Sequence, residues 1–365
     1  MAVRSGDGAL DWRGARGDAR PGGPALTTDT PYFVASVDKL VTASALFVLA
    51  ERGVLDLDGR VSAYLEPALI RGLHVLRGVD RSEELTLRQL VSHTSGLADY
   101  LEDRPQGGRS LIDETLQRGD AGWTVEEALE RVRSRLRPHF APQDPRDPRA
   151  RAQYSDTNYL LLKAVLEAVS GRSVTEVYRA LVFAPLGMSS TFVVSHDEPQ
   201  TDRMACAAAL WAGAQPIDAP VTLRSTFGMF STLDDQLALV RGIVEGRSFA
   251  GGRAVFERMA TPFRRFGQGF DPAALRRPAW PIEYAHGIMR FELPRWLAPF
   301  GPSPAVVGHT GSTGSWAFHC AELDLDLVGT VDQVTAGPVP FRSVGAWLRA
   351  ARTAPNPVRD GPGSC

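Results

Sequence analysis

A serine and a lysine three positions apart are the first residues in this 365-residue chain whose types and spacing could do chemistry. In the tetrapeptide Ser36-Val37-Asp38-Lys39, the serine and lysine side chains would share one face of a helix, about one turn apart. A serine hydroxyl becomes a good nucleophile when a neighbouring base takes its proton, and a lysine can serve if burial lowers its pKa. The flanking residues are apolar enough to predict that burial. Alone, the pair could equally be a helix N-cap and an exposed lysine.

The scarcity of lysine makes this pair more informative. Of the 40 basic residues only Lys39 and Lys163 are lysines, and all the others are arginines. Arginine cannot lose its proton in a protein whereas lysine can. A lysine in this background therefore points to a chemical role.

Two further segments carry candidate side chains. Tyr154 follows the proline-rich stretch 141–152, which we expect to be an exposed loop, and precedes an apolar helix. Its phenol could carry a proton, although a lone tyrosine is more often a hydrogen-bonded core residue. The segment 308–312 (Gly-His-Thr-Gly-Ser) lies on a predicted strand, where glycines let a substrate carbonyl approach the backbone. The N–H of Ser312 and the N–H groups at the start of the helix could hold an oxyanion. By contrast, 93–96 (His-Thr-Ser-Gly) is interpreted as a helix end.

Hydrophobic periodicity predicts the elements that would position these residues. Strands joined by tight turns are expected in 1–35, and three antiparallel strands in 285–293, 305–323 and 324–334. The expected helices are a long one from Ser36 to Gly53, one capped by Thr86, one capped by Thr124, and two over 155–171 and 340–350. The segment 200–280 gives no clear division into helices and strands. The pattern predicts an α/β sheet domain (1–78 and 270–355), a mainly helical domain (79–269), and an active site in the cleft between them.

Composition excludes several classes of function. The formal net charge is −2, which gives no electrostatic case for binding nucleic acid. Cys206, Cys320 and Cys365 show neither a disulfide framework nor metal-ligand spacing, so we expect no metal, no cofactor and a reducing compartment. The first residues lack an apolar signal region, and no apolar run approaches the roughly 18 residues of a membrane span. We therefore expect a cytoplasmic protein that does not contact a membrane.

Taken in chain order, the three candidate segments resemble the signature of the penicillin-recognising serine enzymes: SxxK, Tyr-x-Asn, and Lys/His-Thr-Gly. The segments LTLRQLVSHTSGL, YSDTNYLLLKAVLEAVSGRSV and APLGMSST also look like this family. Tyrosine in the second motif and histidine in the third are most similar to the class C β-lactamase, D-alanyl-D-alanine carboxypeptidase and family VIII esterase group. The resemblance implies a β-lactamase/transpeptidase-like fold, of class α/β plus all-α, in which helices and a helical insertion flank an antiparallel sheet.

The resemblance also implies roles for individual residues. Ser36 would be the acylated nucleophile, Lys39 its activating partner, and Tyr154 the group that carries the proton to the leaving group. The backbone N–H groups of Ser36 and Ser312 would form the oxyanion hole. The substrate would be bound by Asp156, His309, Thr310 and Gly311. Asp156 stands where the family usually has asparagine. Its negative charge would hold Lys39 protonated and disfavour anionic β-lactams.

Three functions follow from these expectations. The first is a serine hydrolase that opens an ester or amide of a small molecule through an acyl-enzyme. The second is a transacylase of natural-product or antibiotic biosynthesis, in which an amine or alcohol replaces water. The third is a non-catalytic binding relative. The sequence does not identify the acyl donor or the oligomeric state.

Overall fold

An antiparallel sheet joins the two ends of the chain in the computed structural model, which describes residues 1–265, 282–292 and 304–353. Its strand order is β10-β11-β12-β13-β14-β15-β1-β2, so the N-terminal hairpin extends the sheet formed by the C-terminal strands. The strands are β1 (Ala2–Ser5), β2 (Asp11–Arg13), β10 (Arg264–Arg265), β11 (Glu283–Tyr284), β12 (Met289–Glu292), β13 (Ala305–Thr310), β14 (Trp316–Cys320) and β15 (Leu325–Gly329).

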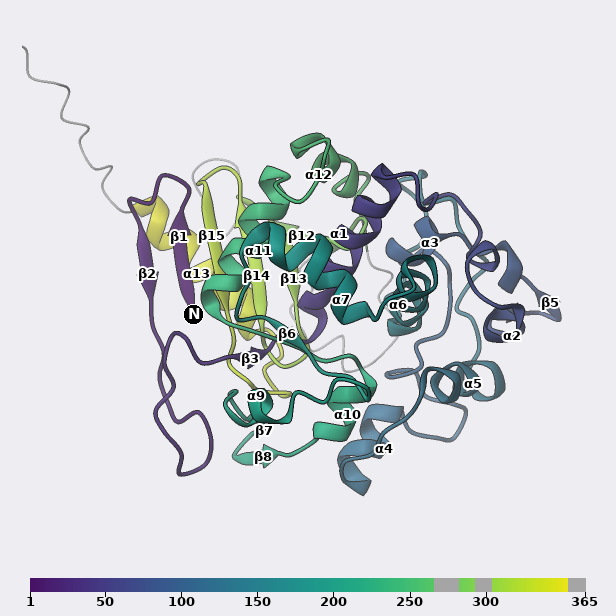
Figure 1. Cartoon of the computed structure of the whole chain (residues 1–365), viewed down its shortest axis with the longest axis horizontal. Helices are drawn as coiled ribbons and strands as arrows, with labels where there is room; N and C mark the ends of the chain where they lie inside the picture. The colour runs from purple at the N-terminus through teal and green to yellow at the C-terminus, as the bar shows by residue number, and fades with distance from the viewer. Residues whose placement is uncertain (266–281, 293–303, 354–365) are drawn as a thin grey trace, which may run out of the picture.

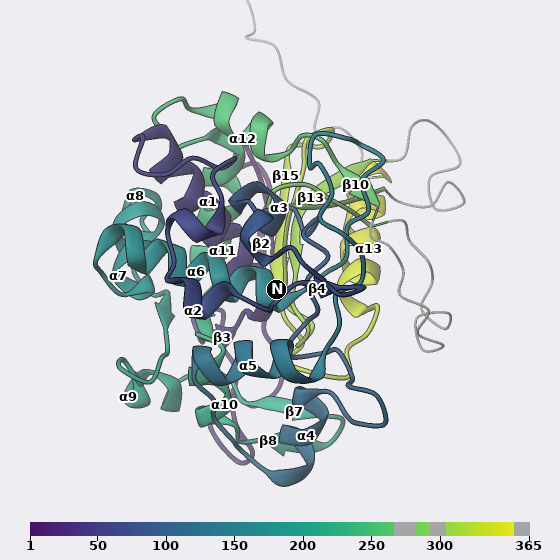
Figure 2. The same ribbon diagram turned by 90° about the vertical axis from the view of Figure 1, so that its right-hand side faces the viewer.

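Helices cover both faces of this sheet. On one face lie α1 (Asp38–Glu51), α11 (Leu233–Glu245) and α12 (Arg253–Met259), and on the other lies α13 (Val339–Thr353) (Figure 2). Side chains alternate between the faces: Ala317 of β14 joins the core that contains α1 and α11, and Phe318 joins the core that contains α13. Every residue of β14 and β15 is buried, as expected for a sheet packed on both sides.

A second group of helices lies beside the sheet, away from β1 and β2 (Figure 1). It includes α2 (Pro67–Ile70), α3 (Leu87–Val91), α4 (Leu111–Arg118), α5 (Val125–Arg135) and α6 (Asp156–Ser170). The remaining helices are α7 (Val174–Tyr178), α8 (Ala184–Leu186), α9 (Thr201–Ala205) and α10 (Pro220–Ser225), and the short 3-10 or π turns are η1 (Ala35–Val37), η2 (Val61–Ala63), η3 (Ser82–Glu84) and η4 (Arg179–Phe183).

Small sheets complete the fold. One of them has the order β3-β9-β6 and leads directly into the nucleophile segment. The strands outside the large sheet are β3 (Tyr32–Phe33), β6 (Phe192–Val193) and β9 (Met229–Ser231), and the pairs β4 (Val75–Leu76) with β5 (Val79–Asp80) and β7 (Leu210–Ala212) with β8 (Gln215–Ile217).

Three helix boundaries that the sequence predicts from capping residues are confirmed. Thr86 and Thr124 are the N-caps of α3 and α5, and each forms a capping box with the residue three positions later. Gly171 ends α6 in the left-handed conformation, with φ of 63°. α3 ends at Val91, however, so the glycine at position 96 is not its cap. A Cβ at that position would lie 2.0 Å from the carbonyl oxygen of Phe140, so close packing explains why the residue is glycine.

Two predictions about extent need correction. The stretch 305–323 is not one strand but the hairpin β13–β14, because the glycine-rich turn 311–315 reverses the chain. Residues 233–265 were assigned to the helical domain, yet α11 packs against β14 and β15, and β10 is part of the large sheet. The division into two domains stays a prediction, and its parts at 270–281, 293–303 and 354–355 lie outside the described residues.

Within residues 1–265, 282–292 and 304–353, the structure contains no helix with the length and hydrophobicity needed to span a membrane. The cytoplasmic location stays a prediction.

We predict that Leu46→Ala lowers the free energy of unfolding by about 2–5 kcal/mol, because it leaves a cavity in the core around α1. Leu46 has an exposed fraction of 0%. Val54, just after α1, is 44% exposed and offers a control. Urea denaturation should show a change of less than about 0.5 kcal/mol for Val54→Ala. Equal effects of the two substitutions would contradict this packing.

Candidate active site

Ser36 lies in the short turn η1, between β3 and α1, and contacts from two sides fix this turn. The N–H of Val34 donates to the carbonyl of Met229 (2.9 Å), and the Val34 carbonyl accepts from the Ser315 hydroxyl (2.6 Å). Ala35 has φ of 47°, a conformation that costs a non-glycine residue energy. The surrounding contacts therefore hold the nucleophile segment in a strained shape, with Ser36 partly exposed.

The structure brings together the three side chains that the sequence proposed as catalytic. The Nζ of Lys39 lies 3.1 Å from the Oγ of Ser36, and the hydroxyl of Tyr154 lies 2.7 Å from the same oxygen. Both are hydrogen-bond distances. Lys39 projects from the first turn of α1, and Tyr154 comes from the loop before α6. The spacing within 36–39 thus produces the predicted geometry, and the contact with Tyr154 is made across 118 residues.

The charge of Lys39 follows the expectation drawn from Asp156 and not that of an amine made neutral by burial. Its side chain is buried, at 4% exposure, but its Nζ lies 2.6 Å from the Oδ1 of Asp156. Burial lowers the pKa of Lys39, and the negative charge of Asp156, with smaller contributions from Tyr154 and Asp38, outweighs burial and raises that pKa well above its usual value. Lys39 is therefore an ammonium group at neutral pH.

The other lysine of the chain forms a second buried ion pair close by. The Nζ of Lys163, on α6, lies 2.8 Å from the Oδ2 of Asp38 and 3.3 Å from the carbonyl oxygen of Thr226. Burial raises the pKa of Asp38, and the charges of Lys163 and Lys39 more than reverse this effect, so the net pKa is lowered. Both lysines thus occupy buried sites with an aspartate partner.

Tyr154 is packed against a residue that sequence reasoning had set aside. The ring of His93 lies 4.6 Å from the ring of Tyr154, at an interplanar angle of 31°. His93 Nδ1 is 3.0 Å from the side-chain amide of Asn158, whose oxygen accepts from the Ser95 hydroxyl (2.6 Å). That bond directs the amide N–H groups at His93, so Nδ1 is an acceptor and Nε2 carries the proton. Burial lowers the pKa of His93 and keeps it neutral. The segment 93–96 was the sequence feature that could have indicated a role for His93 near the site.

The predicted direct contact of His309 with substrate is not supported, because its side chain has an exposed fraction of 0%. Its Nδ1 lies 2.7 Å from the carbonyl oxygen of Thr310, and its Nε2 lies 3.3 Å from the hydroxyl of Tyr284. Burial lowers the pKa of His309 to about 3, so the imidazole is neutral. It therefore carries no charge for a substrate carboxylate.

The turn after β13 brings the second predicted oxyanion donor to the nucleophile segment. A Cβ at Gly311 would lie 2.5 Å from the carbonyl oxygen of Val34, so only glycine allows this close approach. Thr310 is partly exposed and Ser312 is exposed. The backbone N–H of Ser312 makes no hydrogen bond to the described part of the chain, so it is available to a substrate oxygen.

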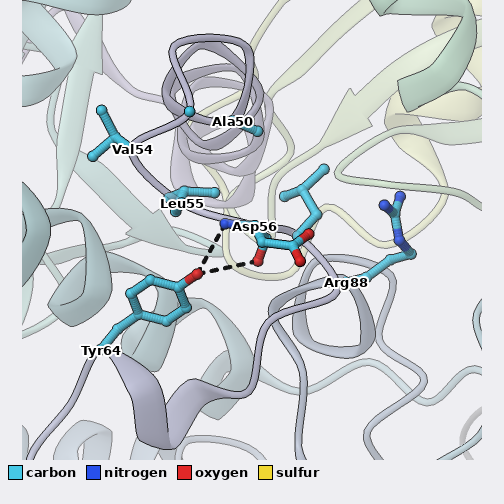
Figure 3. Close-up of a pocket in the computed structure, with 8 residues that line it drawn as sticks. Ala50, Val54, Leu55, Asp56, Tyr64 and Arg88 are labelled. Atoms are coloured by element: carbon cyan, nitrogen blue, oxygen red, sulfur yellow. Dashed lines mark hydrogen bonds between the residues drawn. The ribbon is translucent and has the colours of Figure 1, made fainter.

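A surface hollow lies elsewhere on the molecule. It has a volume of about 560 Å³ at the C-terminal end of α1 and is lined by residues such as Tyr64 and Arg88 (Figure 3). Ala50, on its wall, is roughly 16 Å along the helix from Lys39, at 1.5 Å per residue. This hollow is therefore separate from Ser36. In the described parts of the chain, no group of three or more potential metal ligands is present.

Comparisons with known proteins bear on the family and the fold. A family model described as Beta-lactamase matches residues 1–349. Among solved structures, the D-amino acid amidase from Ochrobactrum anthropi SV3, complexed with L-phenylalanine, superposes with a TM-score of 0.70. It is 20% identical, and the match covers 96% of this chain and 93% of that one. This likeness shows the predicted β-lactamase/transpeptidase-like fold.

Sequence relatives have several activities. Esterase EstB of Burkholderia gladioli is 27% identical over 323 residues, which are 79% of this chain and 75% of that protein. Penicillin-binding protein 4* of Bacillus subtilis is 26% identical over 46% of this chain, and the match spans only 32% of that protein. Monacolin J acid methylbutanoyltransferase of Aspergillus terreus is 30% identical over 46% of this chain and 38% of its own length.

We predict that Asp38→Asn lowers the free energy of unfolding by about 3–5 kcal/mol at pH 7, because it leaves the buried ammonium of Lys163 without its partner. The folded-state pKa of Asp38 is lowered, so its stabilisation is complete above the ordinary value of 3.8 and is lost as the pH falls through the folded value. The difference between the denaturation curves of the variant and the parent should therefore begin to shrink below about pH 4 and disappear below the folded-state pKa.

Asp58 provides the control, because it is 39% exposed in its ion pair with Arg88. Asp58→Asn should cost less than about 1 kcal/mol. A loss for Asp38→Asn that is the same at pH 3 and pH 7 would show that charge is not the cause.

Proposed function

The chain belongs to the beta-lactamase family, and on this premise we propose that it is a serine acyl-enzyme hydrolase acting on an uncharged ester or amide of a small molecule. The observation that carries the proposal is the position of the Ser36 Oγ, within hydrogen-bond distance of both Lys39 and Tyr154. A non-catalytic relative would have no need to keep two proton-bearing groups on one partly exposed hydroxyl.

In the proposed reaction, the Ser36 oxygen attacks the substrate carbonyl, and the N–H groups of Ser36 and Ser312 hold the oxyanion that forms. Tyr154 then donates its proton to the departing alcohol or amine. Burial raises the pKa of Tyr154 well above its usual value, so the phenol holds its proton until the leaving group takes it. Water hydrolyses the acyl-enzyme by the reverse steps.

The charges beside Ser36 support an uncharged acyl donor. The carboxylate of Asp156 would repel a substrate carboxylate placed near the scissile bond, and the ammonium of Lys39 is already paired with it. His309 is neutral and buried, so it cannot replace the lysine that the third motif often has. β-Lactams, which carry a carboxylate near the reacting carbonyl, should therefore acylate Ser36 slowly.

A transacylase is the second candidate, and one relative favours it. Monacolin J acid methylbutanoyltransferase is by name an acyltransferase, and it is 30% identical over 177 residues. An amine or alcohol would then take the place of water in the second half of the reaction. Tyr154 and Lys39 would serve both acceptors, so a role in natural-product biosynthesis is compatible with the same site.

We predict that an activated neutral ester adds one acyl group to the intact protein, measured as a mass increase that maps to Ser36. The Ser36→Ala protein should gain no such mass, because the oxygen that forms the bond is missing. A β-lactam at equal concentration should label at least about tenfold more slowly, for the electrostatic reason given above. Labelling of Ser36→Ala at the rate of the parent protein would refute the assignment of the nucleophile.

The choice of acceptor can be measured on the same acyl-enzyme. For hydrolysis, we predict that its mass decays at a rate that small amines and alcohols leave unchanged. For transacylation, decay should accelerate in proportion to the acceptor concentration, with the amide or ester appearing as product. Chromatography of the products separates the two outcomes.

A further inference from the structure

We propose that Asp156 is the proton acceptor of the nucleophilic pair, which takes a proton from Lys39 so that Lys39 can take the proton of Ser36. This inference rests on the proposed function and deepens it. Asp156 would act through Lys39, so that the activating unit is Ser36, Lys39 and Asp156 together. The motif resemblance assigns position 156 to substrate binding and not to this role.

The first argument is the unbroken line of contacts. The Ser36 Oγ, the Lys39 Nζ and the Asp156 Oδ1 follow one another at 3.1 Å and 2.6 Å. The side chain of Lys39 is 5% exposed and that of Asp156 is 17% exposed, so little water solvates the pair. Moving one proton from the ammonium to the carboxylate replaces two poorly solvated charges by two neutral groups. Poor solvation favours the neutral pair more here than at an exposed ion pair, while the attraction between the two charges keeps the ion pair as the resting state.

The second argument is that, within the part of the chain that the structure describes, no other proton acceptor is hydrogen-bonded to the Ser36 hydroxyl. Lys39, as an ammonium, donates to the Ser36 oxygen and cannot accept. Tyr154 donates to the same oxygen and keeps its own proton, because burial raises its pKa. Asp156 is the group next in line that has a free acceptor oxygen. An asparagine at this position could bond to Lys39 but could not take its proton.

The proton balance closes over one acylation. Lys39 gives a proton to Asp156 and receives the proton of Ser36, as the bond between the Ser36 oxygen and the carbonyl carbon forms. Tyr154 gives its proton to the leaving group as the bond from the carbonyl carbon breaks. Lys39 then reprotonates Tyr154, and Asp156 returns its proton to Lys39. The net change is the transfer of one proton from Ser36 to the leaving group.

The surroundings hold Asp156 in place. Its backbone N–H donates to the Oδ2 of Asp99 (3.1 Å), whose Oδ1 accepts from the N–H of Leu101 (2.9 Å). Burial and the charge of Asp156 raise the pKa of Asp99. The titratable groups with an electrostatic interaction with Lys39 or Asp156 come from several neighbouring elements: Asp38 of α1, His93 after α3, Asp99 and Tyr100 of the following loop, Tyr154 and Tyr159 of the α6 region, Tyr178 of α7, and His309 of β13.

The central test compares Asp156→Asn with the parent protein over a range of pH. We measure the rate of acylation by the neutral activated ester between pH 6 and pH 9. The parent should give a nearly flat profile, because Lys39 need not lose its proton to solvent. In Asp156→Asn, the rate should fall tenfold for each pH unit below the pKa that Lys39 has in that variant, since only its neutral fraction can act.

The two-lysine composition allows an independent measurement of that pKa. Lysine labelled with ¹³C at the ε position should give two side-chain NMR signals, from Lys39 and Lys163. Lys163→Arg identifies the second signal. Removing the Asp156 carboxylate should lower the pKa of Lys39. In Asp156→Asn, the pH at which the acylation rate begins to fall should equal the Lys39 pKa measured by NMR. This readout needs no substrate, so it bears on the pair even if the proposed function fails.

Two further variants test whether the effect of Asp156→Asn comes from the lost negative charge or from a change in structure. Asp156→Glu keeps a carboxylate and should retain a flat profile at a reduced rate. Glu102→Gln removes an exposed negative charge from the same neighbourhood without contacting Lys39, and should behave like the parent. If Asp156→Asn fails to fold, as judged by thermal unfolding, the Glu variant and the parent's NMR titration decide the question.

Three results would overturn the inference: a flat profile for Asp156→Asn, an equal loss at every pH in both position-156 variants, or an unchanged Lys39 titration. Failure of the parent to acquire any acyl group on Ser36 would instead refute the proposed function.

Discussion

A buried ammonium group with one carboxylate beside it is the constraint on which the site depends. Removing Lys39 from water strongly disfavours its charge, and Asp156 at 2.6 Å offsets that penalty. The balance between burial and the charge of Asp156 sets whether Lys39 presents an ammonium or a neutral amine to the Ser36 oxygen. The fold must therefore hold the N-terminal turn of α1 and the start of α6 at a fixed separation, since a shift of about an ångström would leave a buried charge unpaired.

A pair of adjacent ion pairs provides that fixed separation. Asp38 and Lys39 are neighbours on α1, and their partners Lys163 and Asp156 are seven residues apart on α6, which is close to two turns and hence the same helix face. The two pairs cross-link the helices with opposite polarity. Tyr154 comes two residues before α6, so the cross-link also sets its distance from Ser36. In a chain that otherwise uses arginine, both lysines serve this junction.

Contacts between residues within one helical turn could be predicted directly from the sequence. The combined effect of residues far apart in the sequence could not. Capping by Thr124 and the spacing of Ser36 and Lys39 depend on residues within one turn, and the structure confirms both. The pKa of Lys39 is raised by a contact made across 117 residues, and the sequence indicated this effect only through the family resemblance that placed Asp156 beside Lys39. The burial of His309 likewise follows from sheet packing. In 200–280, α11 carries a threonine cap and a terminal glycine, signals that were present but isolated among short, irregular elements.

The same constraint explains why the fold does not decide which acceptor completes the reaction. In the proposed reaction, water, an alcohol and an amine would each lose a proton to the groups around Ser36 when they attack the acyl-enzyme, and Tyr154, Lys39 and Asp156 would serve all three in the same way. Relatives with esterase and acyltransferase names are both compatible with that shared chemistry. Discrimination must therefore arise where the acceptor binds. On the described part of the chain, Thr310 and Ser312 are the exposed or partly exposed groups at that end of β13. A transferase would hold its acceptor against them long enough to exclude water, whereas a hydrolase needs no such contact.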